Sequence, residues 1–247
     1  MLVCERKVRR LWWGFLRFFF RLLYNELAWT YDLVAWVVSL GQWNAWGRAA
    51  IPYLVSHRRS QGGQVLELAH GPGHLLTAMA RHGLDPVGLD LSSHMGRLVR
   101  QRLKKAGRPW IPLVCGRAQT LPFPDSYFEW VVSTFPTDFI LDPSTLREVA
   151  RVLRPGGRLV VVAWVRIGGR DLLSRFLRWL YQVAGQGGPL PSGSEAIVTQ
   201  VGFTPRVEWV QVGCSKVMVV VAERQLTARA ARLTPRDRTA GGSVLSV

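Results

Sequence analysis

The sequence has few cysteines and few acidic residues, and it lacks several common motifs. Its three cysteines are scattered among 247 residues and show neither metal-ligand spacing nor a disulfide framework. No G-x-x-x-x-G-K-[ST] motif is present, which excludes a P-loop. No stretch reaches the ~18 uncharged apolar residues that a membrane-spanning helix usually needs. No secretory cleavage site follows the basic, apolar start of the chain. We therefore expect a protein of a reducing cytoplasm, without a metal site.

Basic residues outnumber acidic ones by two to one. Lys and Arg number 32 against 16 Asp and Glu, which gives a formal net charge of +16. A charge of this size predicts an anionic partner, either a nucleic acid or an anionic membrane surface. The hydrophobic share of 48% supplies a sizeable core. The length allows one large α/β domain or two small ones.

Residues 64–76, QVLELAHGPGHLL, form the stretch around which the chain is organised. Val65, Leu66 and Leu68 predict a short buried parallel strand. A turn rich in small residues follows, and a helical pattern then runs over residues 74–82. Strand, glycine-rich turn and helix together open a nucleotide-type α/β fold, in which the glycines let a ligand approach the backbone.

Two acidic residues flank this turn. Glu67 lies inside the first predicted strand, and Asp90 lies at the end of the second, residues 87–91. A carboxylate at the second position can accept both hydroxyls of a ribose, while Glu67 can face a cationic amino group. Because Leu76 replaces the third glycine of a dinucleotide turn, the pattern favours a ligand with a ribose, a positive charge and no phosphates, such as S-adenosylmethionine. The simpler alternative is a strand-to-helix turn that binds nothing.

Four motifs follow one another along the chain: VLELAHGPGHL, VGLDLSSHM, RAQTLPFPDSYFEWVVSTF and LREVARVLRPGGRLVVVAW. In this order they resemble the class I S-adenosylmethionine-dependent methyltransferases, in particular the branch similar to the ubiquinone/menaquinone C-methyltransferases. The similarity covers about residues 27–223. It implies S-adenosylmethionine as the cofactor and an α/β fold with a Rossmann-like, doubly wound, seven-stranded and mostly parallel sheet, preceded by an N-terminal helical extension.

The remaining strands of this sheet are predicted from apolar runs. After the first two, we expect strands at residues 111–115, 130–134, 158–164, 206–212 and 216–222, with residues 154–157 forming a turn before the fifth. Residues 217–222 are too apolar for an exposed edge, so we expect the last strand to be inserted between two neighbours.

The resemblance also implies which residues bind the cofactor. Tyr31 belongs to a region, "YD…S.G…W", that covers the cofactor in quinone methyltransferases; the alternative is an ordinary core helix. The loop of Ala118 and Gln119 is implied to lie against the adenine ring, and Thr134 ends a strand where open α/β sheets bind ligands. The predicted cofactor-binding residues are Tyr31, Glu67, Leu68, Ala69, Gly71, Gly73, Asp90, Leu91, Met95, Ala118, Gln119 and Thr134.

Three positions depart from the family pattern. Ala69 replaces the first glycine of a G-x-G-x-G turn, and its methyl group is tolerated if its φ is negative. Arg117 replaces the usual adenine-side acid, so that hydrogen bond must come from the backbone or from Gln119. Glu129 replaces the usual Asp before the fourth strand. These departures bear on cofactor affinity and leave the fold unchanged.

The chain divides into four predicted parts. In the first, an arginine stripe lies opposite a broad face of Trp, Phe and Leu over residues 5–24, as in a helix that lies in a membrane interface. The alternative is a helix packed on the protein's own core. The parts are a basic amphipathic helix (1–26), a helical lid and linker (27–63), a cofactor-binding domain (64–223, with an insert at 165–192) and a basic disordered tail (224–247).

Together these features predict a methyltransferase that acts on a lipophilic acceptor, with a prenylated quinone or phenol as the first choice. The alternatives are a phospholipid amine methyltransferase and a non-catalytic membrane- or RNA-binding protein with the same fold. Arginines alternating with Trp and Phe favour lipid over nucleic acid. With the cysteine pattern, we expect a cytoplasmic protein that is peripheral on the inner face of the membrane. His57, His70 and His74 are candidate general bases, of which none is selected. The oligomeric state is left open.

Overall fold

The computed structural model describes residues 39, 41–55, 64–168, 191 and 193–225. The N-terminal helix, Tyr31 and His57 lie outside these residues, as do most of the predicted insert and the C-terminal tail beyond Gln225. The predictions made for those segments therefore stay predictions.

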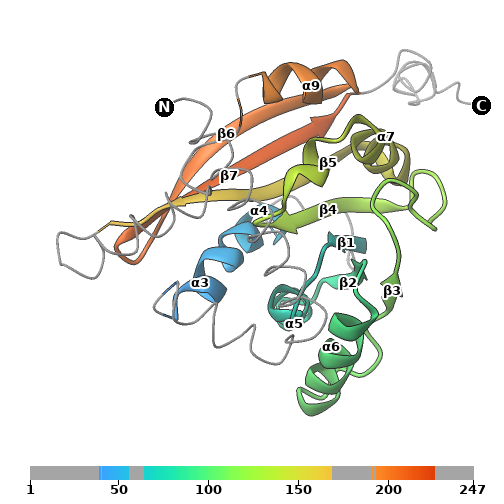
Figure 1. Ribbon diagram of the computed structural model, residues 1–247, viewed down its shortest axis with the longest axis vertical. Helices are drawn as coiled ribbons and strands as arrows, with labels where there is room; N and C mark the ends of the chain where they lie inside the picture. The colour runs from blue at the N-terminus through green and yellow to red at the C-terminus, as the bar shows by residue number, and fades with distance from the viewer. Residues whose placement is uncertain (1–38, 40, 56–63, 169–190, 192, 226–247) are drawn as a thin grey trace, which may run out of the picture.

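A seven-stranded sheet in the order β3-β2-β1-β4-β5-β7-β6 forms the centre of the molecule (Figure 1). The first five of these strands are parallel to their neighbours, and β7 pairs antiparallel with both β5 and β6. The predicted doubly wound, mostly parallel sheet is confirmed. The strands are β1 (Gln64–Leu68), β2 (Asp85–Asp90), β3 (Leu113–Cys115), β4 (Phe128–Thr134), β5 (Leu153–Arg166), β6 (Phe203–Val212) and β7 (Ser215–Arg224).

The insertion of β7 between β5 and β6 confirms the prediction from its apolar run. Residues 217–222 are all buried, and β7 pairs with a neighbouring strand along both of its edges. Several strands begin or end a few residues from the predicted positions, and two of these differences are largest in their effect on the fold. β3 begins two residues later than expected, and residues 154–157 belong to β5, where a register shift against β4 accommodates them within the strand.

Helices cover both faces of the sheet (Figure 1). Ser92 accepts a hydrogen bond from the backbone N–H of Met95 and so caps α6, as its position predicts. Asp142 caps α7 in the same way, with Pro143 at the first helical position. The helices are α3 (Trp43–Gly47), α4 (Ile51–Val55), α5 (His74–Arg81), α6 (Ser93–Lys105), α7 (Pro143–Val152) and α9 (Ser194–Gln200), with 3₁₀ turns η2 (Arg48–Ala50) and η3 (Asp138–Leu141).

The core consists of two layers, one on each side of the sheet. Apolar side chains of α3, α4, α5 and α6 pack on one face, and those of α7 and α9 pack on the other. This arrangement follows from the crossovers: β1, β2 and β3 run outward in one direction, and the chain then returns past β1 to β4. The point where the order reverses lies between β1 and β4, and the carboxyl ends of these strands flank it.

Gly88 in β2 marks the tightest packing between the sheet and the first turn. A Cβ at this position would lie 2.8 Å from Leu76 Cδ1, 2.9 Å from His70 Cδ2 and 3.0 Å from Leu113 Cδ2. The glycine therefore lets the side chains of the turn and of α5 lie directly on the strand.

We predict that Gly88→Ala lowers the free energy of unfolding by about 1–3 kcal/mol, because the added methyl group overpacks this contact. Urea denaturation of the full chain measures the change. Gly96→Ala in α6 is the matched control: no atom lies within 4 Å of its Cβ position, and helix propensity should raise stability by up to about 1 kcal/mol. A Gly88→Ala variant as stable as the wild type would contradict the packing argument.

Candidate functional site

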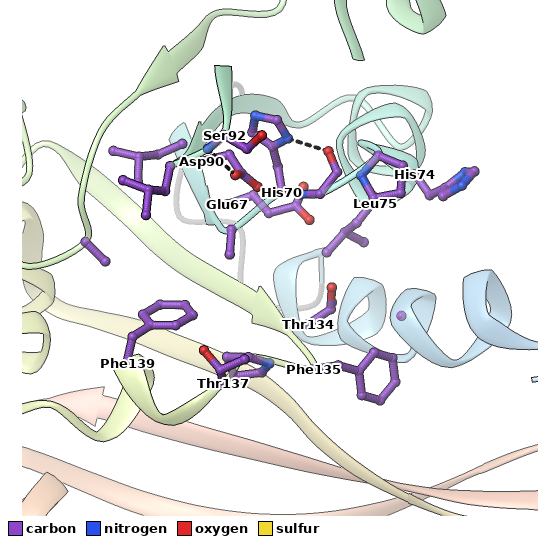
Figure 2. A pocket seen from close by; sticks show the side chains of 18 of the residues that line it. Glu67, His70, His74, Leu75, Asp90, Ser92, Thr134, Phe135, Thr137 and Phe139 are labelled. Atoms are coloured by element: carbon purple, nitrogen blue, oxygen red, sulfur yellow. Dashed lines mark hydrogen bonds between the residues drawn. The ribbon is translucent and has the colours of Figure 1, made fainter. Parts of the chain in front are cut away.

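A cleft of about 450 Å³ opens at the carboxyl ends of β1, β2 and β4, at the reversal point of the strand order. Figure 2 shows Glu67 and Asp90 on one side of it and Phe135, Thr137 and Phe139 on the other. Helix α3 contributes Trp43, Asn44 and Gly47, and η2 contributes Arg48. The cleft thus has a carboxylate-rich side and an aromatic side.

Asp90 fixes the turn after β1. Its Oδ2 accepts a hydrogen bond from the backbone N–H of Gly71 at 2.9 Å, and its Oδ1 accepts one from the N–H of Ser92 at 2.8 Å. Each carboxylate oxygen can accept a further hydrogen bond. Asp90 therefore can hold the turn and still offer both oxygens to a pair of vicinal hydroxyls.

Glu67 is a buried acid without a full set of partners. Its side chain is 1% exposed, and Oε2 has no hydrogen-bond partner within the part of the chain that is described. Burial raises the pKa of Glu67 well above its ordinary value, and the nearby charge of Asp90 raises this pKa further, against a hydrogen bond from the Leu76 backbone that lowers it. An unpartnered buried carboxyl group costs free energy. A cationic ligand group would supply the missing partner, so these residues fit the amino group and ribose of S-adenosylmethionine.

Ala69 adopts a left-handed backbone conformation, with φ +54°. The condition under which the methyl group of Ala69 is tolerated, a negative φ, is therefore not met. The chain turns sharply after Ala69 so that the N–H of Gly71 can donate to Asp90. Gly71 also has a positive φ, +49°. A position that favours glycine is thus occupied by alanine, at a cost of roughly 1–2 kcal/mol.

The structure brings most of the predicted cofactor-binding residues together. Glu67, Ala69, Gly71, Asp90, Leu91, Ala118, Gln119 and Thr134 all line the cleft. Leu68, Gly73 and Met95 do not line it.

These three residues support the site from behind. The carbonyl of Leu68 accepts a hydrogen bond from Ser133 Oγ at 2.9 Å, and Met95 is fully buried under the cap of α6. Gly73 has φ +74°, and a Cβ there would lie 2.6 Å from Val99 Cγ1. Gly73 therefore allows the turn to pack on α6.

The loop after β3 adds two polar side chains, Arg117 and Gln119, to the lining of the cleft. Gln119 Nε2 donates to Asp142 Oδ2 at 3.3 Å, which ties the loop after β3 to the cap of α7. The exposed Arg117 also lines the cleft. The side chain predicted to replace the missing acid is thus already held by Asp142.

The aromatic side of the cleft was not assigned from the sequence. The rings of Trp43 and Phe135 lie 4.4 Å apart between centroids at an interplanar angle of 41°. Phe135 has φ +49°, and its N–H donates to the Val162 carbonyl at 2.8 Å. The position of Phe135 just after a strand was the available signal. No sequence signal marked Trp43. The tryptophan that matches the "YD…S.G…W" region is Trp46, and Trp46 lies in the core, 1% exposed.

Two of the candidate histidines lie at the cleft. Nδ1 of His70 is 2.8 Å from the Gly71 carbonyl, so Nδ1 carries the proton and donates. Burial lowers the pKa of His70 and so favours the neutral ring, although the charge of Asp90 acts in the opposite direction. Nε2 of His74 lies 3.0 Å from Arg102 Nη1, which places this nitrogen as the acceptor.

In the described part of the chain, no three His, Cys, Asp or Glu side chains gather as metal ligands would. None of the described helices is long and apolar enough to cross a membrane.

We predict that Ala69→Gly raises the free energy of unfolding by up to about 1 kcal/mol, because it relieves the left-handed conformation. Urea denaturation measures the gain. The control is Ala78→Gly in the middle of α5, where the same chemical change should cost about 1 kcal/mol. Equal losses in the two variants would show that Ala69 carries no strain.

We predict that binding of S-adenosylmethionine releases a proton from Glu67. The free carboxyl has a raised pKa, and a cationic amino group beside it favours the carboxylate. Affinity should therefore rise with pH until the free carboxyl is ionised, by at most tenfold per unit. Calorimetry over about pH 5 to 7.5, below the titration of an α-amino group, in buffers of different ionisation enthalpy, measures the proton.

The matched control is Glu67→Gln, which should bind more weakly and lose the proton release. A wild type whose affinity does not change with pH would contradict the role of Glu67.

Comparison with known proteins agrees with the motifs. The ubiE/COQ5 methyltransferase family model matches residues 20–195. A demethylmenaquinone methyltransferase of Streptomyces avermitilis is 36% identical over 140 residues, which are 56% of this chain and 57% of the relative. A ubiquinone/menaquinone biosynthesis C-methyltransferase of Geobacter sulfurreducens is 34% identical over 174 residues, 66% of each protein. The chain thus matches less than two thirds of the length of these relatives.

Solved structures agree on the fold. Phosphoethanolamine N-methyltransferase 2 of Haemonchus contortus, in complex with S-adenosyl-L-methionine, superposes with a TM-score of 0.54 at 17% identity, over 74% of this chain and 53% of that protein. The resemblance drawn from the motifs is confirmed, and with it S-adenosylmethionine as the cofactor. The chain belongs to the ubiE/COQ5 methyltransferase family.

Proposed function

We propose that the protein transfers the methyl group of S-adenosylmethionine to a lipophilic acceptor, a prenylated quinone or phenol ring, at the inner surface of a membrane. The observation that carries the proposal is the two-sided cleft, with a buried, incompletely partnered Glu67 on one side and the Trp43–Phe135 aromatic pair on the other. The named activities of the curated relatives support a quinone-type acceptor.

The carboxylate side holds and orients the cofactor. Glu67 accepts from the amino group, and Asp90 accepts from the ribose hydroxyls while its backbone partners keep it in place. S-adenosylmethionine supplies an electrophilic methyl group when it is bound. In this proposal the lid residue Tyr31, within residues 27–63, covers the same side, and Leu68, Gly73 and Met95 act by shaping the turn.

The aromatic side holds the acceptor ring. Trp43 and Phe135 offer flat apolar surface, which suits stacking of another ring, and Phe139 extends it along the cleft. The backbone of Phe135 is held by its hydrogen bond to Val162, which positions its ring beside Trp43. Catalysis then rests on holding the acceptor atom in line at about 3–3.5 Å from the methyl carbon and on excluding water.

Residues 1–26 place this cleft at the bilayer. A prenylated acceptor is dissolved in the membrane, so an enzyme that reaches it gains from docking at the surface. The basic amphipathic pattern of residues 5–24 supplies charge attraction and apolar burial for that purpose. The net charge of +16 acts in the same direction.

The proposal is tested by incubating the full chain with methyl-labelled S-adenosylmethionine and vesicles that contain a prenylated demethylquinol, followed by mass spectrometry of the lipids. We expect label on the quinol ring. Phe135→Ala should lower kcat/KM for the quinol by at least about tenfold, because it removes stacking surface, and should leave cofactor affinity within about twofold. Tyr127→Ala, a half-exposed aromatic outside the cleft, is the matched control.

Label on phosphatidylethanolamine instead of the quinol would overturn the acceptor in favour of a phospholipid amine. Cofactor binding without transfer to any lipid would overturn the activity itself.

A further inference from the structure

Strand β5 continues past the end of β4, and the β6–β7 hairpin continues with it, so these three strands project beyond the cleft-side end of the sheet (Figure 1). On the face that carries the α7 and α9 layer further back, their side chains form three cross-strand rows. The rows are Val161–Val220–Val207, Trp164–Met218–Trp209 and Arg166–Lys216–Gln211, in the order from the core toward the tip.

The middle row is aromatic. Trp164 and Trp209 meet edge to face, with centroids 5.9 Å apart at 78°, and Met218 between them is only 4% exposed. Trp209 itself is 44% exposed, and Val207 in the neighbouring row is 52% exposed. Large apolar side chains gathered at a surface indicate a contact with a partner.

The outer row is basic. Arg166 lies over the ring of Trp209, with Cζ 5.3 Å from its centroid, and Lys216 is the cross-strand partner of Arg166. Both are exposed, and none of the nine residues in the three rows is acidic. The acid of this part of β6, Glu208, points to the opposite face, where Tyr53 donates to it at 2.6 Å. Within these nine residues, the face therefore presents aromatic surface next to positive charge.

We propose that this face, which we name the tryptophan–arginine face (Trp164, Arg166, Val207, Trp209, Gln211, Lys216 and Met218), docks on a lipid bilayer with anionic headgroups. Tryptophan favours the boundary between water and hydrocarbon, where an apolar ring and its N–H are both accommodated. Arginine and lysine extend their apolar stems along the same boundary and place their charges at the headgroups. The alternating pattern of the sheet supplies both on one side.

Charge complementarity and position select the bilayer as the occupant. The chain carries +16 overall, which is attracted to an anionic surface and opposes association with a second copy of itself. The face lies at the carboxyl end of β5, and β5 holds the acceptor wall through the Phe135–Val162 hydrogen bond. Docking here brings the aromatic side of the cleft toward the membrane, so this inference rests on the proposed lipophilic acceptor.

The exposed Cys214, in the turn between β6 and β7, gives a direct probe of docking. We would label Cys214 with a polarity-sensitive fluorophore in a full-length chain in which Cys4 and Cys115 are serine, and add vesicles with or without an anionic lipid. We expect a blue shift with anionic vesicles. The matched control carries the label at Thr204→Cys, with all three native cysteines replaced. Thr204 is exposed on β6, about 23 Å along the strand from Gln211 of the outer row at about 3.3 Å per residue. A label at this position should show no shift.

The variant Arg166→Glu/Lys216→Glu should weaken vesicle partitioning at low salt by at least about 30-fold, since each basic side chain near an anionic surface contributes a factor of about five. The control Arg100→Glu/Lys104→Glu in α6 makes the same change of net charge on the other edge of the sheet and should lose less. Trp209→Ser should weaken the part of binding that salt does not screen. Both Arg166 and Lys216 are exposed, so the double variant tests the face even if Trp209→Ser fails to fold.

Three results would overturn the inference. In the first, the protein sediments with vesicles but the Cys214 label does not shift, which would assign docking to another segment such as residues 5–24. In the second, the Cys214 label is already blue-shifted without vesicles and does not change, which would mean that another segment of the chain covers the face. In the third, sedimentation velocity shows a dimer that Trp209→Ser abolishes, which would make the face a contact between copies.

Failure of docking is distinguishable from failure of the proposed function. A quinol with a short, water-soluble side chain needs no membrane, so the docking variants should methylate it at the wild-type rate while losing turnover of the long-chain acceptor in vesicles. If the wild type methylates neither the short-chain quinol nor the long-chain acceptor, the proposed function is refuted, while the docking measured with vesicles is unaffected.

Discussion

Two carboxyl groups buried at the ends of neighbouring central strands dominate the physics of this site. Burial raises the pKa of Glu67, and the nearby charge of Asp90 raises this pKa further. Asp90 is compensated by two backbone N–H groups, one from each flanking turn. Glu67 is not, since one of its oxygens has no partner among the described residues. In the proposed function, the cationic amino group of the cofactor supplies the partner that this oxygen lacks.

The same Asp90 contact explains the backbone around it. Pulling the Gly71 N–H onto the carboxylate requires a tight turn, and both Ala69 and Gly71 take positive φ to make it. The strained backbone of Ala69 lies in the cleft itself, as is common for residues that shape binding turns. Gly73 has no side chain where the turn packs on α6, and Gly88 has none where the turn packs on β2. Ligand geometry and packing are therefore set by one short segment.

How far the sequence predicts this site depends on whether the signal is local. The strand, turn and two carboxylates lie within about 27 residues and follow local rules of apolar runs and turn chemistry, so their placement was predicted. The sheet was predicted from the resemblance of four ordered motifs, and the insertion of β7 from the apolar run of residues 217–222. The φ of Ala69 was not, because the turn it belongs to is shaped by a hydrogen bond from Gly71 to Asp90 on another strand. The Trp43–Phe135 pair was not either, since its members come from elements far apart in the chain and meet only in the fold. The same holds for the Trp164–Trp209 pair.

A strongly basic protein that binds a cationic cofactor must separate two electrostatic environments. Surface cations act over a Debye length of about 8 Å at physiological salt, so the exposed bases of the outer row and of α6 act mainly at the surface on which they lie. The buried carboxyl pair acts at short range and in a less polar medium, where its effect is stronger. In the proposed docking, the outer basic row can thus attract an anionic surface without expelling the cofactor. This separation requires the acids to be buried at the strand ends and the bases to be exposed at the sheet tip and on α6, and the structure has this arrangement.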